Sequence, residues 1–234
     1  MNKITFQNVM PAPLCPPEGG KTPLSSPEGG KKRLWGEASS PFGGTEGGFT
    51  FQRGQSYLVE ADSGKGKSTF CSYILGYRHD YSGHVLFDDV DARSYTIADW
   101  SRLRQRHVSC LFQELRLFPE LTALENVEIK NKLTHHKTRQ QIEQWFERLG
   151  IADKLTALVG RMSFGQQQRV ALMRALAQPF DFLLADEPIS HLDDRNAEAM
   201  ATLITEEAQA QGAAIIVTSI GKRLPLHYQH TLQL

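Results

Sequence analysis

The sequence has few cysteines and no long apolar run, and both shortages narrow what the protein can be. The 234 residues include three cysteines, Cys15, Cys71 and Cys110, whose spacing matches neither a metal site nor a CxxC pair. Such a sparse, odd set suits a reducing cytosol better than a disulfide scaffold. No apolar run approaches the roughly 20 residues that cross a bilayer. The N-terminal residues MNKITFQNVM also lack the apolar core of a signal peptide. We therefore expect a cytoplasmic chain that reaches a membrane only through a partner.

An excess of charge of either sign is also lacking. Lys and Arg together number 26, and so do Asp and Glu. This balance provides no long-range field to gather nucleic acid or anionic lipid, so we expect no nucleic-acid partner. The length suits one domain that includes a subdomain, and we treat residues 1–234 as a single domain.

Residues 15–48 differ in composition from the rest of the chain. They contain the near repeat PPEGGK and SPEGGK, then TEGG, and are rich in Pro, Gly and Ser. Such a segment cannot bury enough apolar surface to offset chain entropy, which predicts a disordered surface insertion. An inserted repeat, tolerated because long surface loops close at little entropic cost, is the favoured interpretation. A partner-binding loop around the basic residues 31–33 is the alternative.

Outside this insertion, apolar strands alternate with helices. This alternation predicts an α/β sheet covered on both faces, with its site at the carboxyl ends of the strands. We expect strands at residues 4–9, 49–54, 56–60, 84–88, 108–113, 180–188 and 213–219, and helices at 68–76, 124–133, 138–149, 152–159, 165–177 and 193–211.

The stretch VEADSGKGKSTF, residues 59–70, matches a phosphate-binding loop between a strand and a helix. Glycines there let backbone N–H groups converge on phosphate oxygens, and the helix start adds a positive dipole end. Lys67 is expected to reach the β- and γ-phosphates, and Ser68 to bind Mg²⁺. Ala61 replaces the first glycine of the usual pattern, which fits unless that position needs a positive φ. The predicted nucleotide-binding residues are Ala61, Asp62, Ser63, Gly64, Lys65, Gly66, Lys67, Ser68 and Thr69.

Two consecutive acids, Asp186 and Glu187, end the buried strand that contains LLADEP. Adjacent acids are costly in a core but useful for a metal. Asp186 is predicted to hold Mg²⁺, and Glu187 to orient and polarise the attacking water. A solvated turn with helix-capping acids would explain DEP alone, but the phosphate loop upstream makes that alternative less favourable.

Further motifs follow in order between and after these two. MSFGQQQRVALMRALAQ (162–178) resembles the signature sequence of ATP-binding cassette (ABC) ATPases. CLFQELRLFPELTALENV (110–127) is similar to the family's glutamine loop, and DEPISHLD (186–193) to its acidic strand and dimer-contact loop. The sequence of this glutamine loop is most similar to that of ATPases of lipoprotein-release, cell-division and macrolide-export type systems. The match extends over nearly the whole chain outside the insertion.

The resemblance implies a P-loop NTPase core with a largely parallel sheet, an antiparallel β subdomain and a helical subdomain at about residues 114–164. It also implies a homodimer, or a pairing with another ATPase subunit, that encloses two ATP molecules. The chain would dock on an integral-membrane subunit at the inner face of the cell membrane. Gln113 would sense Mg²⁺ and the attacking water, and Asp193 would contact the partner. Ser163, Phe164, Gly165 and Gln166 would bind the γ-phosphate presented by the partner. As alternatives, Ser163 and Asp193 could simply be N-caps of their helices.

The sequence departs from the family pattern at Ser219, where a histidine would contact the γ-phosphate. Serine is shorter and cannot carry a positive charge near neutrality, which predicts ATP binding with slow hydrolysis. Lys222 and Arg223 lie downstream, and a solvated turn is their favoured interpretation. No aromatic residue stands where one usually stacks on adenine; Phe6, Trp35, Phe42 and Phe49 are the candidates.

The favoured function is an ATP-hydrolysing subunit that powers an ABC transporter or a related membrane complex. The alternative is a regulatory module that closes on ATP with little or no turnover. A chromosome or DNA-repair ATPase would need long heptad arms, which this chain lacks. A small-molecule phosphate-loop kinase would not explain MSFGQQQR.

The insertion provides a first test. Removal of residues 16–47 is expected to leave folding intact, because a segment without a core of its own contributes little to stability. Soluble expression and circular dichroism of the shortened protein measure this. An insoluble product would contradict the interpretation.

Overall fold

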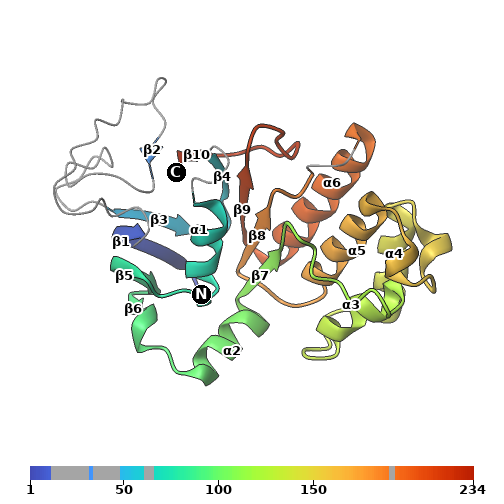
Figure 1. Ribbon diagram of the computed structural model, residues 1–234, viewed down its shortest axis with the longest axis horizontal. Coiled ribbons are helices and arrows are strands. Elements are labelled where there is room, and N and C mark those ends of the chain that lie inside the picture. The colour runs from blue at the N-terminus through green and yellow to red at the C-terminus, as the bar shows by residue number, and fades with distance from the viewer. Residues whose placement is uncertain (12–31, 34–47, 61–65, 190–192) are drawn as a thin grey trace.

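The computed structural model describes residues 1–11, 32–33, 48–60, 66–189 and 193–234, and these residues form two sheets and a group of helices. The helices α3 to α6 gather at the end of the molecule away from the antiparallel sheet (Figure 1). The helix α1 (Lys67–Ile74) lies between the two sheets. The fold is therefore α/β, as the alternation of strands and helices predicts.

The larger sheet is parallel throughout and contains every strand that leads to the predicted nucleotide site. All of its pairings run in the same direction. Its six strands are, in order, β2 (Lys32–Arg33), β10 (His230–Gln233), β4 (Ser56–Glu60), β9 (Ala214–Ser219), β8 (Phe182–Asp186) and β7 (Val108–Leu111).

Alternate residues of these strands enter different cores, because successive side chains point to opposite faces of a sheet. Ile215 on β9 and Leu183 on β8 pack with the helical side, together with residues of α3 to α6. Their neighbours Ile216 and Leu184 pack against α1 and the antiparallel sheet. Both faces are thus buried, which explains the nearly continuous apolar character of these strands.

The second sheet is antiparallel and lies on the α1 side of the molecule (Figure 1). Aromatic side chains fill the space between it and α1: Phe6 and Phe51 both contact Phe70 of α1, with ring centroids 5.3 and 5.6 Å away. Its order is β3 (Gly48–Gln52), β1 (Lys3–Pro11), β5 (Tyr81–Phe87) and β6 (Val90–Asp91).

Most of the longer helices begin at a hydroxyl residue whose side chain caps the first turn. Thr96, Thr122, Thr138 and Ser163 each form a reciprocal capping box with the residue three positions later. The helices are α2 (Ile97–Arg106), α3 (Ala123–Asn131), α4 (Arg139–Arg148), α5 (Phe164–Leu176) and α6 (Asp194–Gln211), with short 3₁₀ turns at Ala92–Ser94, Ala152–Lys154 and Val159–Arg161.

One expected helix was wrong, and some elements were missed. In place of a helix at 152–159 there is a 3₁₀ turn at Ala152–Lys154, followed by another at Val159–Arg161, and the helix α2 and the strands β6 and β10 were not predicted. Only Trp100 and Leu103 of α2 are buried, so its apolar stripe is narrow, although its Thr96–Asp99 capping box is a start signal. Within residues 15–48, which we expected to be disordered, Lys32–Arg33 form a strand with β10 and Gly48 begins β3; residues 15–31 and 34–47 lie outside the described residues.

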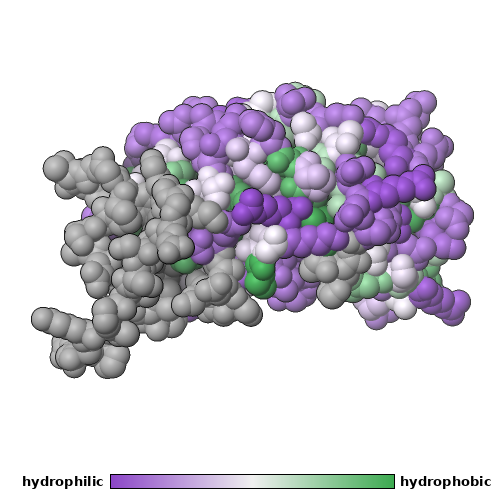
Figure 2. Space-filling model, turned by 90° about the horizontal axis from the view of Figure 1, so that it is seen from above, coloured by the Kyte–Doolittle hydropathy of each residue, from purple (hydrophilic) through white to green (hydrophobic). Residues whose placement is uncertain are grey.

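The described part of the chain is mostly polar on one face. Where Figure 2 is coloured, that face is predominantly hydrophilic, with hydrophobic residues in small patches. Within the described ranges, no helix combines the length and the apolar character needed to cross a bilayer.

The fully buried Asn126 of α3 fixes the segment between β7 and α3. Its amide Nδ2 donates to the carbonyls of Phe118 and Thr122, each at 3.0 Å, and its Oδ1 accepts from the Phe118 N–H at 2.8 Å.

Asn126→Ala would remove these bonds and leave the Phe118 N–H without its partner, whereas the Phe118 and Thr122 carbonyls would keep their backbone hydrogen bonds from Leu121 and Asn126. We expect a loss of about 1–3 kcal/mol in the free energy of unfolding, measured with urea. Gln140→Ala on the exposed face of α4 is the control; equal effects of the two substitutions would show that Asn126 does not fix the segment.

Candidate nucleotide site

The predicted site residues come from the carboxyl edge of the parallel sheet. Asp186 at the end of β8 pairs in register with Thr218 of β9, and Glu60 at the end of β4 pairs with Ser219. The carboxyl ends of parallel strands meet at one edge, where α/β proteins bind their ligands. The phosphate-loop residues Ala61, Asp62, Ser63, Gly64 and Lys65 follow β4 and lie outside the described residues.

The structure brings Lys67, Glu187 and Gln113 together. The Lys67 Nζ lies 3.5 Å from a Glu187 carboxylate oxygen, and both side chains are at most 10% exposed. The Gln113 amide donates to the other Glu187 oxygen at 3.1 Å. These three residues come from α1, the end of β8 and the segment after β7. A buried ion pair of this kind lies where a phosphate and an attacking water would be expected.

Gly66 precedes Lys67 in a conformation that suits its predicted role. Its φ is +99°, in the left-handed region that favours glycine. As the N-cap of α1 it has no side chain, so the first N–H groups of the helix stay accessible to a phosphate. Ser68 and Thr69 follow in the first turn of the same helix.

The Asp186 carboxyl group is buried, and burial raises its pKa above the usual range. Hydrogen bonds from the hydroxyls of Thr218 and Ser68 and the charge of Lys67 act in the opposite direction. Ser68 and Asp186, both predicted to hold Mg²⁺, therefore lie near each other.

The oxygen donors at this edge fit a magnesium ion. Mg²⁺ prefers hard oxygen ligands and is usually held by one or two carboxylates, substrate phosphates and water. Asp186 and Ser68 supply a carboxylate and a hydroxyl, and the Gln113 amide lies beside Glu187. No group of three or more His, Cys, Asp or Glu residues that could hold a metal exists among the described residues. Asp186 and Ser68 thus suit Mg²⁺ as one carboxylate and one hydroxyl of a larger oxygen set.

Glu187 has an unusual backbone conformation. Its φ of +49° lies in the left-handed region, which is uncommon for a residue other than glycine. Its N–H donates to the Thr218 carbonyl at 3.2 Å, so strand β9 holds this conformation in place. Strained residues of this kind cluster at functional sites.

The signature residues form the surface-exposed first turn of α5. Ser163 caps the helix: its hydroxyl accepts from the Gln166 N–H at 3.3 Å, and the Gln166 side chain accepts from the Ser163 N–H at 3.0 Å. The side chain of Phe164 is 43% exposed, and Gly165 and Gln166 are partly exposed. Ser163 therefore is an N-cap, as the alternative interpretation predicted. It is also exposed, so a partner molecule can reach it.

Asp193 also caps its helix, as the alternative for this residue predicted. Its carboxylate accepts from the backbone and side-chain N–H groups of Asn196, at 2.9 and 2.7 Å. Asn196 in turn accepts from the Arg169 guanidinium of α5 at 2.8 Å. The start of α6 is thereby tied to the helix that begins with the signature residues.

The Ser219 hydroxyl belongs to a tight turn. It donates to the Lys222 carbonyl at 2.7 Å and accepts from the Gly221 N–H at 3.1 Å, and the residue is 2% exposed. Lys222 and Arg223 pair with Asp194 and Glu60, at 3.5 and 2.5 Å. These ion pairs agree with the interpretation of residues 222–223 as part of a solvated turn.

Phe6, one of the candidates to stack on adenine, is wrong for that role because it is 2% exposed within the core. Phe49 is half-buried and packs edge-on against Phe51 and Tyr57. Trp35 and Phe42 lie outside the described residues.

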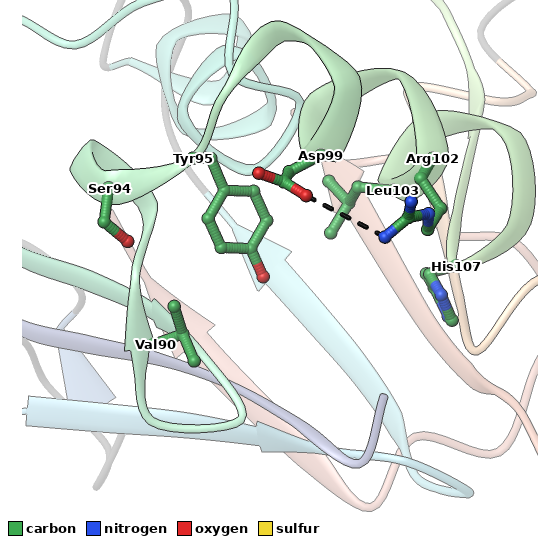
Figure 3. A pocket seen from close by; sticks show the side chains of 7 residues that line it. All are labelled: Val90, Ser94, Tyr95, Asp99, Arg102, Leu103 and His107. Carbon is green, nitrogen blue, oxygen red and sulfur yellow. Dashed lines mark ion pairs between the residues drawn. The ribbon is translucent and has the colours of Figure 1, made fainter.

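A cavity of about 340 Å³ lies away from these residues. In Figure 3 the side chains of Tyr95, Asp99 and Arg102 border it, and the Asp99–Arg102 ion pair spans 3.9 Å. His107, also on its wall, directly precedes β7, so the cavity is at the amino edge of the sheet, opposite Asp186. It does not belong to the nucleotide site.

Thr218 is a site residue that the sequence reasoning missed. It is fully buried and donates a hydrogen bond to Asp186 from the adjacent strand. A hydroxyl residue near the end of an otherwise apolar strand was the available signal.

We expect Thr218→Val to lower the free energy of unfolding by about 1.5–3 kcal/mol, the usual contribution of a hydrogen bond to a charged group. Thr218→Ser keeps the hydroxyl and should stay closer to the wild type. Denaturant unfolding of the two variants measures the difference, and a Val variant as stable as the Ser variant would refute the role.

Comparison with known proteins agrees with this geometry. Residues 46–190 match the family model described as ABC transporter. The "Uncharacterized ABC transporter ATP-binding protein YbbA" of Escherichia coli (strain K12) is 32% identical over 78% of this chain and 82% of its own length. The Bacillus subtilis protein of the same description, YvrO, is 33% identical over 72% and 75%. The chain spans about half the length of the mycobacterial relatives that it matches, such as Rv0073 of Mycobacterium tuberculosis, with 34% identity over 74% of this chain and 53% of that protein.

Solved structures lead to the same family. The "Dimeric Structure of MJ0796, a Bacterial ABC Transporter Cassette" aligns with a TM-score of 0.66 at 26% identity, over 74% of this chain and 78% of that one. A post-hydrolysis dimer of MJ0796 bound to ADP and Pi aligns at 0.64 and 27%, over 74% and 78%. The fold is thus that of a P-loop NTPase cassette, and the chain belongs to the ABC transporter family.

Proposed function

We propose that the protein binds and hydrolyses ATP and powers an ABC transporter, or a related membrane complex, through ATP-driven closure of a dimer. The contact of Lys67 and Gln113 with Glu187 at the carboxyl edge is the observation that carries this proposal. A cation suited to phosphate, a carboxylate suited to orienting water and a polar amide within one site support this proposal. The dimeric MJ0796 cassette and its ADP-and-Pi form support the same chemistry.

Each residue has a separate task in this proposal. The N–H groups around Gly66 and the Lys67 ammonium bind the β- and γ-phosphates, and residues 61–65 and Thr69 complete the loop. Ser68 and Asp186 hold Mg²⁺, with Gln113 beside it; when bound, the ion neutralises charge on the phosphates. Glu187 orients and polarises the attacking water.

The second copy of the subunit completes each site. Ser163, Phe164, Gly165 and Gln166 of the opposing subunit approach the γ-phosphate, because a capped helix start with oriented N–H groups attracts anions. Asp193 contacts the partner beside it. An integral-membrane subunit receives the motion at the inner face of the membrane, with the ATPase on the cytoplasmic side. The finer likeness to lipoprotein-release, cell-division and macrolide-export systems stays a prediction.

We further propose that hydrolysis is slow. Ser219 stands where the family pattern has a histidine, and its hydroxyl is engaged by Gly221 and Lys222 in its own turn. Loss of one group directed at transition-state charge typically lowers the rate by about a hundredfold or more. A regulatory module with little or no turnover is the second candidate, and the same serine favours it.

Steady-state phosphate release tests both candidates. We expect the wild type to release phosphate slowly, and Glu187→Gln to abolish release while nucleotide still binds. Ser219→His should raise turnover by about a hundredfold. An imidazole is longer than the serine hydroxyl and can carry a positive charge next to the γ-phosphate, which serine cannot.

Ile220→His is the matched control, because it adds the same side chain at the exposed neighbouring position. No gain in Ser219→His over Ile220→His would contradict slow hydrolysis by loss of the histidine. Wild-type release no faster than that of Glu187→Gln would favour the regulatory module instead.

A further inference from the structure

We propose that Arg174, in the last turn of α5, is a positioning residue that holds Gln113 against Glu187. The inference rests on the proposed function, because it concerns the same reaction. It arises from a strained turn just after Gln113. Arg174, which is distant in the sequence, donates hydrogen bonds to this turn.

The strained turn consists of Leu115 and Arg116. Their φ values are +58° and +51°, so two consecutive residues other than glycine occupy the left-handed region. This region is sparsely populated for side-chain-bearing residues, and two in succession persist only where surrounding contacts impose them. Gln113 lies two residues before Leu115, so the course of this turn decides where its amide lies.

Arg174 provides such a contact. Its guanidinium donates to the Arg116 carbonyl at 2.6 Å and to the Leu115 carbonyl through its second terminal nitrogen. One planar guanidinium group therefore hydrogen-bonds to both left-handed residues at once, a geometry that lysine cannot reproduce. Arg174 is half-buried, so these bonds form in surroundings where electrostatic attraction is strengthened.

Other contacts hold the turn from its own side. The Leu115 side chain is 5% exposed in the core, and its N–H donates to the Phe112 carbonyl at 3.0 Å. The Arg116 guanidinium lies 3.9 Å from the centre of the Phe112 ring. Arg174 adds to these contacts two hydrogen bonds from α5 to the carbonyls of the turn itself.

The resulting chain of contacts ends at the reacting groups. Arg174 fixes the carbonyls of residues 115 and 116, the turn positions Gln113, and Gln113 donates to Glu187 at 3.1 Å. The same helix α5 begins at Phe164, directly after Ser163. A continuous helix of 13 residues thus joins the signature turn to the residue that fastens the Gln113 turn.

Kinetics of Arg174→Lys and Arg174→Met test this role. We expect kcat to fall by about 10–100-fold in the Met variant, the usual effect of a small misplacement of catalytic groups, and by less in the Lys variant. KM for ATP should stay unchanged, because Arg174 does not contact the nucleotide site directly. A thermal melt checks that both variants fold.

Relief of the backbone strain distinguishes positioning from simple packing. Arg116→Gly removes the steric penalty of the left-handed conformation, whereas Arg116→Ala removes the same side chain and keeps the penalty. Added to Arg174→Met, the glycine should restore part of kcat and the alanine should not. A purely structural role predicts no difference between the two double variants.

Hydrogen exchange gives a readout that does not depend on activity. The amides of residues 115–117 should exchange faster in Arg174→Met than in the wild type, and α5 itself should keep its protection. Normal kcat in Arg174→Met, or unchanged exchange at 115–117, would overturn the proposal. Absence of phosphate release from the wild type would instead reject the proposed function, and the exchange result would still decide whether Arg174 holds the turn.

Discussion

The attraction between the Lys67 ammonium and the Glu187 carboxylate is the interaction on which the site depends. The two groups lie 3.5 Å apart and are almost fully buried. Buried charges are costly unless they are paired, so the fold must bring the start of α1 and the end of β8 together. The parallel sheet achieves this because β9 lies between β4 and β8 and the ends of all three strands meet at one edge. Low-dielectric surroundings also strengthen the field of Lys67, which is proposed to act on a phosphate.

Much of this arrangement could be predicted from local sequence. Apolar strands such as 213–219, buried on both faces, and the glycine-rich stretch before Lys67 carry their own signals. The contacts of Thr218 with Asp186 and of Arg174 with residues 115–116 could not be predicted, because they join segments distant in the sequence. The helix α2 could not be predicted because its apolar stripe is narrow. The burial of Phe6 could not be predicted because its aromatic side chain alone does not indicate which face of the strand it lies on.

Several predicted contact residues have a local task as well. Ser163 and Asp193 cap α5 and α6, and these caps fix the direction of the first N–H groups of each helix. Such preorganisation does not compete with binding an anion, because the dipole end and the ordered amides are what the anion requires. The link from Arg169 to Asn196 connects the two starts, so the surface proposed to meet a second copy is held as one unit.

The central claim is that one nucleotide is bound between the Lys67 side of one subunit and the Ser163 side of another. A structure of the Glu187→Gln protein with a non-hydrolysable ATP analogue and Mg²⁺ tests it most directly. The account predicts a two-fold dimer in which Lys67 of one protomer and Ser163 of its mate contact the same γ-phosphate. A nucleotide-bound monomer, or a dimer in which these residues contact no common ligand, would contradict it.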